Sequence, residues 1–230
     1  MKRSFSASVL STIALAAFPG AAAADDGKNE LLGVDMSTNS PGQHMYDWTG
    51  FHAGVHGGYL WGDLDNANSG FGDFSINGPL FGVQAGAAVQ NGMFVFGAEA
   101  DFALSGADGG FISCCAGQEG LVADLEWLAT IRGTAGMAFD KLHIYATGGV
   151  AFAGVDFTAR NFGTTLNTSD TWTGWTIGAG GNFRISEQVS ANAQYLYLDL
   201  GDSTVPTGWS SPLNYSMTGH VARIGINIHR

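Results

Sequence analysis

Apolar and polar side chains alternate one by one along most of the chain after residue 46. Between residues 48 and 61, for example, the odd positions include Phe51, Val55 and Tyr59, whereas the even positions are mostly glycine and histidine. A period of two places successive side chains on opposite faces of a β-strand, and the i, i+3, i+4 stripes of a helix are missing. The pattern predicts eight strands, over residues 48–61, 80–90, 93–104, 124–139, 142–152, 172–185, 189–200 and 218–229.

The connections between these strands alternate in length. Turns of two or three residues are predicted near residues 91, 140 and 187, and Asn91-Gly92 is a strong hairpin signal. Longer polar segments, which we expect to be loops, lie near residues 62–78, 105–123, 157–171 and 200–216. Short turns at one rim and long loops at the other, with strands of about ten residues, are typical of outer-membrane barrels.

The first residues have the features of a secretory signal peptide. Lys2 and Arg3 precede an apolar run, and Ala22-Ala23-Ala24 forms a small-residue cleavage site, so residues 1–24 are predicted to be removed. The apolar run is shorter than the about 20 residues that a membrane-spanning helix needs. Residues 25–45 are expected to form a flexible periplasmic segment, and residues 46–230 are expected to form the barrel.

Charge separates a membrane barrel from a soluble one. The chain has 9 basic and 20 acidic residues, and it has no basic cluster after residue 3, which argues against a nucleic-acid partner. Only Lys28 and Lys141 would be left as lysines after cleavage. A soluble β-sandwich or lipocalin-like barrel presents charges to water, whereas a charge facing lipid at mid-depth costs about 2 to 4 kcal/mol. The sequence therefore predicts an all-β, eight-stranded, antiparallel, up-and-down transmembrane β-barrel with apolar side chains facing lipid.

The inward positions of these strands are predicted to hold a network of charged side chains. Opposite signs fall on nearby strands, and charges in a low-dielectric interior need partners, so we interpret them as ion pairs that fill the lumen. The interior of an eight-stranded barrel is only wide enough for side chains. A gate or narrow channel with exchangeable ion pairs is the alternative interpretation. The predicted lumenal network consists of Glu99, Asp101, Glu126, Arg132 and Arg223.

The histidines and cysteines do not add up to a metal site. His52 and His56 share one face of a strand but lie about 13 Å apart on it, which is too far to chelate one ion. We interpret them as lumenal packing and predict no metal and no cofactor. Cys114 and Cys115 are the two cysteines of the chain, and their place in the second long loop makes them candidates for a loop disulfide or a link to another chain.

A serine and a histidine near the last strand are candidates for catalytic machinery. Ser216, Thr218 and His220 share one parity, and Asp202 is close in the sequence. The chain has no Gly-x-Ser-x-Gly elbow, and such residues are common in surface loops. We therefore predict that the protein is not an enzyme.

The long loops carry many carboxylates and one basic residue, Arg160. An acidic rim repels the phosphates of lipopolysaccharide unless divalent cations bridge the two, so lipopolysaccharide is a predicted partner through such cations. The acidic residues of this predicted rim are Asp63, Asp65, Asp73, Asp108, Glu119, Asp156, Asp170 and Asp202.

Three strings of residues resemble a known family. They are Tyr46-Asp47-Trp48-Thr49-Gly50-Phe51, Tyr195-Leu196-Tyr197-Leu198-Asp199-Leu200-Gly201 and His220-Val221-Ala222-Arg223-Ile224-Gly225-Ile226-Asn227. Together they resemble the porin-like surface barrels of alpha-proteobacteria, which belong to the OmpA-like group of eight-stranded outer-membrane barrels, and the resemblance covers residues 46–230.

The resemblance implies a protein of the cell outer membrane that the barrel assembly machinery inserts. It implies a structural, envelope-stabilising and surface-display role, with a small-solute porin or a surface protein that binds haemin or a host ligand as the alternatives. The family ends in an aromatic residue that the assembly machinery reads, whereas here Arg230 follows His229. Ile224, Ile226 and Ile228 keep the alternation of the last strand.

Overall fold

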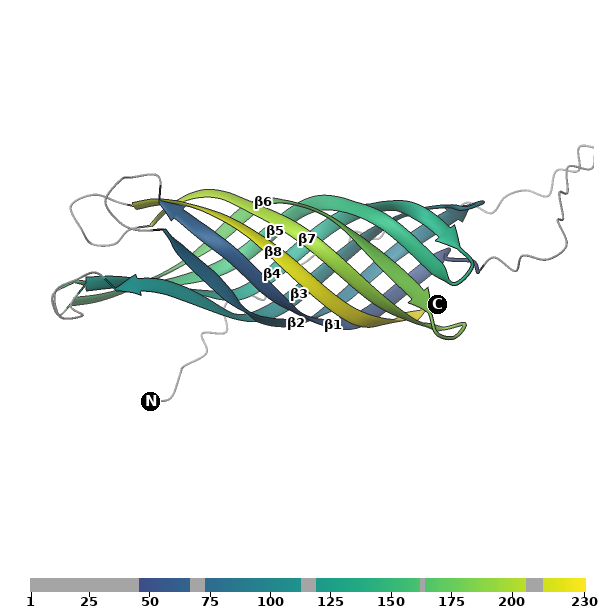
Figure 1. The fold of residues 1–230 in the computed structure, drawn as a ribbon, viewed down its shortest axis with the longest axis horizontal. Coiled ribbons are helices and arrows are strands. Elements are labelled where there is room, and N and C mark those ends of the chain that lie inside the picture. Colours follow the sequence, from purple (N-terminus) through teal and green to yellow (C-terminus); the bar gives the residue numbers. More distant parts are fainter. Residues whose placement is uncertain (1–45, 67–72, 113–118, 162–163, 206–212) are drawn as a thin grey trace, which may run out of the picture. The chain divides into compact units, whose positions relative to one another are not determined.

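A computed structural model describes residues 46–66, 73–112, 119–161, 164–205 and 213–230. These residues form one closed antiparallel barrel in which each strand pairs with the next and β1 pairs with β8 (Figure 1). The predicted eight-stranded up-and-down barrel is thus confirmed. The predicted signal peptide and the segment 25–45 lie outside the described residues. The strands are β1 (Gly50–Asn66), β2 (Phe74–Asn91), β3 (Phe94–Ile112), β4 (Glu119–Phe139), β5 (Leu142–Asn161), β6 (Thr164–Arg184), β7 (Val189–Val205) and β8 (Leu213–His229).

The two ends of the chain's barrel meet at the seam between β1 and β8. The backbone N–H of Phe51 donates to the carbonyl oxygen of Arg230 at 3.0 Å, and the N–H of Arg230 donates back to Phe51 at 2.9 Å. Backbone groups inside a bilayer must be paired within the protein, and a closed barrel pairs them between strands. Among the described residues there is no helix that is long and apolar enough to cross a membrane.

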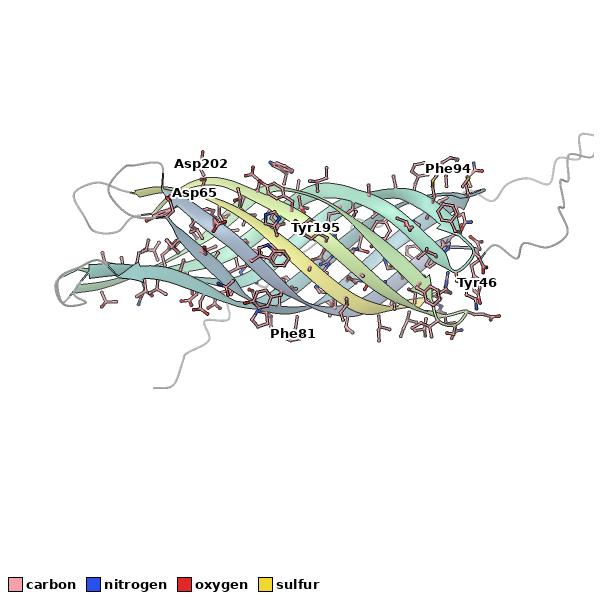
Figure 2. All side chains as sticks on the ribbon, viewed as in Figure 1. Tyr46, Asp65, Phe81, Phe94, Tyr195 and Asp202 are labelled. Atoms are coloured by element: carbon pink, nitrogen blue, oxygen red, sulfur yellow. The ribbon has the colours of Figure 1, made fainter. Side chains whose placement is uncertain are left out.

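The short connections lie at one end of the barrel, which we call the turn end; Figure 2 shows Tyr46 and Phe94 there. In the first hairpin Asn91 pairs with Phe94, so the turn residues are Gly92 and Met93, one position later than the sequence predicted. Gly92 has φ +60°, a conformation that glycine adopts without steric cost. Outer-membrane barrels have short periplasmic turns and longer extracellular loops, so the opposite rim, the loop end, faces the cell exterior.

All eight strands extend further toward the loop end than the alternation predicted, so much of the polar sequence expected to be loop is strand. In these extensions the alternation continues with the opposite sense. On β1, Leu60 and Leu64 are fully buried in the lumen, whereas Asp63 and Asp65 are exposed on the outer wall. The prediction of loops was wrong here because a strand with polar residues outside and apolar residues inside has a polar average composition.

Toward the turn end the outer wall is apolar, as lipid requires. Val83, Ile131 and Ile226 are 58%, 57% and 53% exposed on this wall. The wall changes from apolar to polar at an aromatic belt, which we define as the outward aromatic residue nearest this change on five of the strands. Aromatic girdles of this kind mark the level of the lipid headgroups. The belt consists of Trp61, Trp127, Phe152, Trp175 and Tyr197.

A β-bulge in β4 sits beside this belt. The register with β5 shifts between Leu125 and Trp127, which leaves Glu126 as an extra residue. An extra residue inverts the parity of the strand beyond it. Leu125 is therefore buried in the lumen while Trp127 faces outward, and Glu126 is exposed. The sequence predicted that Glu126 points inward, and this prediction was wrong for this reason.

The two zones of the outer wall predict opposite responses to a new charge. Replacing Ile131 by arginine places a cation against lipid and is expected to lower the free energy of unfolding by about 2 to 4 kcal/mol. The matched control is Val122→Arg on the same strand, beyond the bulge, where water is expected to solvate the charge and the change is about 0.5 kcal/mol or less. Urea titration of the barrel folded in lipid vesicles measures both, and equal losses would contradict the assignment of the zones.

Candidate functional site

Two acidic and two basic side chains meet inside the barrel. Glu99 and Asp101 point inward from β3, Arg132 from β4 and Arg223 from β8, and each is nearly fully buried. The Arg132 guanidinium lies 2.5 Å from Glu99 Oε1 and 2.8 Å from Asp101 Oδ2. The Arg223 guanidinium lies 2.8 Å from Asp101 Oδ1 and 3.5 Å from Glu99 Oε1. Two positive and two negative charges balance, which is the condition for burying them.

Neutral side chains form hydrogen bonds with this charged quartet and extend the network across the lumen. Gln194 on β7 accepts from Arg223 Nε at 2.8 Å and from Arg132 Nη1 at 3.2 Å. Its amide donates to Glu99 at 3.1 Å and contacts the hydroxyl of Tyr145. Since β7 lies opposite β3 in the strand order, these bonds join facing walls. The absence of a side chain at Gly180 provides the space for Tyr145 and Gln194, because a Cβ there would come within 2.8 Å of both.

The two histidines of β1 contact different parts of the quartet. His52 Nε2 lies 3.3 Å from Glu99 Oε2, whereas His56 Nδ1 lies 3.1 Å from Gln84 Oε1 and its Nε2 lies 3.5 Å from Arg223. They pack in the lumen at two separate levels. Among the residues that the structure describes, no group of three or more His, Cys, Asp or Glu side chains is arranged to hold a metal ion.

An apolar plug fills the lumen between the quartet and the loop end. Its residues come from all eight strands and are at most 8% exposed. This plug could not be predicted from the alternation, because many of its inward apolar positions lie in segments that the sequence predicted to be loops. Leucines spaced at even intervals between aspartates, as on β1, were the available signal. The level next to the quartet consists of Leu60, Leu80, Ala103, Leu128, Leu196 and Val221.

The mouth at the turn end is closed by Trp48, which is 4% exposed and precedes β1. Its ring lies 5.4 Å from the ring of His143 and 5.7 Å from that of His229, and the Arg184 guanidinium lies 4.5 Å from it. The backbone holds this position, because the N–H of Trp48 donates to Gln90 Oε1 at 2.8 Å. Arg184 was not singled out from the sequence.

Comparison with known proteins gives the family. The model of the outer membrane protein beta-barrel domain matches residues 8–228. The chain belongs to this family. The 31 kDa outer-membrane immunogenic protein of Brucella melitensis is 33% identical over 202 residues, which are 79% of this chain and 83% of that relative. The family resemblance inferred from the sequence and the location in the cell outer membrane are confirmed.

Solved structures of other outer-membrane proteins have a similar fold. The outer membrane protein OprG of Pseudomonas aeruginosa is similar with a TM-score of 0.52 and 11% identity over 80% of this chain and 97% of that one. The outer membrane protease OmpT of Escherichia coli is similar with a TM-score of 0.51 and 6% identity over 79% of this chain and 97% of that one. At these identities the similarity concerns the fold alone.

The outer-membrane barrel brings together four of the five residues predicted for the lumenal network. Glu99, Asp101, Arg132 and Arg223 form the quartet. Glu126 does not join it, because the bulge in β4 turns its side chain to the outer surface. Cys114 and Cys115, the candidates for a loop disulfide, lie outside the described residues.

Ser216 and His220, the candidate catalytic residues, are not arranged as a nucleophile and its base. Ser216 lies opposite Asp202 in the register of β7 and β8. His220 is four residues away along β8, which is about 13 Å and beyond hydrogen-bond reach. The Nδ1 of His220 is instead 2.7 Å from the hydroxyl of Tyr195 on the outer wall.

The quartet predicts the cost of removing one of its charges. Arg132→Met leaves two buried carboxylates with one arginine, and the free energy of unfolding of this outer-membrane barrel is expected to fall by about 3 to 5 kcal/mol. The double variant Glu99→Gln/Arg132→Met keeps one acid and one base, Asp101 and Arg223, and is expected to recover most of that loss. Urea unfolding in vesicles measures both. If the double variant were as unstable as the single one, the balance of buried charges would not be what stabilises the barrel.

Proposed function

We propose that the protein is a closed, non-conducting and non-enzymatic barrel that stabilises the outer membrane and displays its loops at the cell surface. The observation that carries this proposal is the filling of the lumen at three successive levels. Trp48 covers the turn end, the charged quartet spans the middle, and the apolar plug fills the part toward the loop end.

Each level opposes the passage of water and solutes in a different way. The quartet occupies the cross-section with side chains that are bonded to facing walls, so an ion would have to break several charge-assisted bonds to pass. The level of the apolar plug next to the quartet presents only leucine, valine and alanine side chains to the lumen, and narrow hydrophobic constrictions exclude water. These features favour a structural role over the small-solute porin that the resemblance left as the alternative.

The absence of enzymatic activity is supported by the spacing of Ser216 and His220 on β8. Purified protein incubated with lipopolysaccharide or with peptide is expected to cleave neither. Cleavage that is lost in Ser216→Ala would contradict this part of the proposal.

The proposed partners follow from the membrane in which the barrel lies. Lipopolysaccharide, bridged by divalent cations to the acidic outer wall near the loop end, is the proposed lipid partner, and the barrel assembly machinery is proposed to insert the chain. The outward isoleucines of β8, Ile224, Ile226 and Ile228, supply the apolar face of its last strand. Haemin or host-ligand binding stays a prediction, which a haemin titration followed by Soret absorbance tests.

Electrical recording tests the closed lumen. The purified protein in planar lipid bilayers is expected to produce no stepwise conductance, with a conducting porin in the same bilayer as the positive control. Leu60→Ala/Leu128→Ala/Leu196→Ala thins the plug and leaves the quartet, and it is expected to stay silent as well. Regular conductance steps from the unaltered protein would contradict the proposal, and steps that appear only in Glu99→Gln/Arg132→Met would identify the quartet as a gate.

A further inference from the structure

The outer wall is not uniform, because an open groove of about 950 Å³ runs over β6, β7, β8 and β1 and is bordered by Ile144 of β5 and Phe81 of β2. Small residues form its floor. Ala222 lies between Tyr195 and Tyr59 of the neighbouring strands, and Ala193 lies beside Gly181. Larger side chains rise on either side, including Tyr195 and Phe81, which Figure 2 shows on the wall. The lining is almost wholly apolar, so the groove matches a hydrocarbon chain.

The groove ends toward the loop end at a cluster of aromatic rings. The rings of His220, Trp61 and Tyr195 form a triangle, with His220 5.9 Å from each of the other two centroids and Trp61 6.3 Å from Tyr195. The ring of Tyr197 lies 5.3 Å from that of His220. The Tyr195 hydroxyl and His220 Nδ1 are 2.7 Å apart, which fixes the two rings together. Trp61 and Tyr195 are 40% and 47% exposed, so their faces are available. Such a surface packs against the C–H faces of a sugar ring while its polar edges stay in the headgroup layer.

The next outward positions toward the loop end are acidic. Asp63 and Asp199 lie on either side of Thr218, and Asp65 and Asp202 lie on either side of Ser216. Figure 2 shows Asp65 and Asp202 close together at the loop end. These carboxylates repel a phosphate directly but attract the divalent cations that phosphorylated lipids carry. The apolar groove, the aromatic cluster and the acidic positions therefore follow one another along the same face of the barrel.

We propose that this face, which we call the β6–β1 groove, binds one outer-leaflet glycolipid, the lipid A part of lipopolysaccharide. An acyl chain lies over Ala222 and Ala193, an amino-sugar packs on the aromatic cluster, and divalent cations join its phosphate to the acidic positions above. The groove runs from the aromatic belt toward the middle of the wall, so it lies in the leaflet at the loop end, which is the outer one. The inference rests on the proposed envelope-stabilising function and names the lipid that this function would use.

A matched pair of variants tests the groove. Ala222→Phe fills its floor, whereas Ala100→Phe makes the same change on the exposed outer wall of β3, opposite β7. The protein is incubated with purified lipid A or with phosphatidylglycerol in the presence of Mg²⁺, and native mass spectrometry counts the lipid that it retains. Wild type and Ala100→Phe are expected to retain one lipid A per barrel, and Ala222→Phe at least about tenfold less, since the acyl chain loses its seat. Heat-modifiable electrophoretic mobility shows that both variants are folded.

Two further arms test the headgroup assignment. His220→Leu keeps the apolar groove but removes the ring that is hydrogen-bonded to Tyr195. This variant is therefore expected to show a reduced preference for lipid A over phosphatidylglycerol. Chelation of Mg²⁺ by EDTA is expected to reduce the same preference in the wild type.

Three results would overturn the inference. They are equal retention of lipid A by Ala222→Phe and Ala100→Phe, equal retention of both lipids by the wild type, and a second copy of the barrel, rather than lipid, released from this face by Ala222→Phe. Conductance by the wild-type barrel would refute the proposed function and leave the lipid measurement intact, so the two failures are distinguishable.

Discussion

The whole structure depends on one constraint, which is that the polarity of the barrel wall reverses at the aromatic belt while the backbone pairing continues without a break. Toward the turn end the wall faces lipid and must be apolar outside, so the polar and charged residues point inward. Beyond the belt the wall faces water, and Asp63 and Asp65 point outward while Leu60 and Leu64 fill the lumen. One strand thus behaves as part of a membrane protein at one end and as part of a soluble protein at the other.

The charged quartet follows from the lipid-facing half of this arrangement. A lumen enclosed by lipid-facing strands has to be filled, and polar side chains there have to find partners among themselves. Two arginines and two carboxylates achieve this with Gln194, which bonds to both arginines and to Glu99. The inward glycines are part of the same solution, since side chains at Gly180 would displace Tyr145 and Gln194. The closed lumen, the proposed structural role and the use of the outer wall for lipid are consequences of this packing.

The fold could be predicted from the sequence wherever the apolar residues of a strand face outward and the polar ones face inward. Within the lipid-facing zone the period of two identified every strand and assigned Glu99, Asp101, Arg132 and Arg223 to the lumen. Beyond the aromatic belt the same alternation gave wrong predictions for two physical reasons. The strand extensions are polar outside and apolar inside, so their average composition resembles that of loops, and the bulge at Glu126 inverts the parity of β4 by one residue. Neither the closure of the turn end by Trp48 nor the groove over Ala222 could be predicted, because both depend on contacts between strands far apart in the sequence.

The most direct test of the reversal is a spin-label scan along the outer face of β1, with Cys114 and Cys115 replaced by serine and the barrel reconstituted in lipid vesicles. Single labels at Val55, Tyr59, Asp63 and Asp65 are compared for collisions with oxygen, which concentrates in hydrocarbon, and with a water-soluble nickel chelate. The account predicts that oxygen dominates at Val55 and Tyr59 and that the nickel chelate dominates at Asp63 and Asp65. The same preference at all four positions would contradict it.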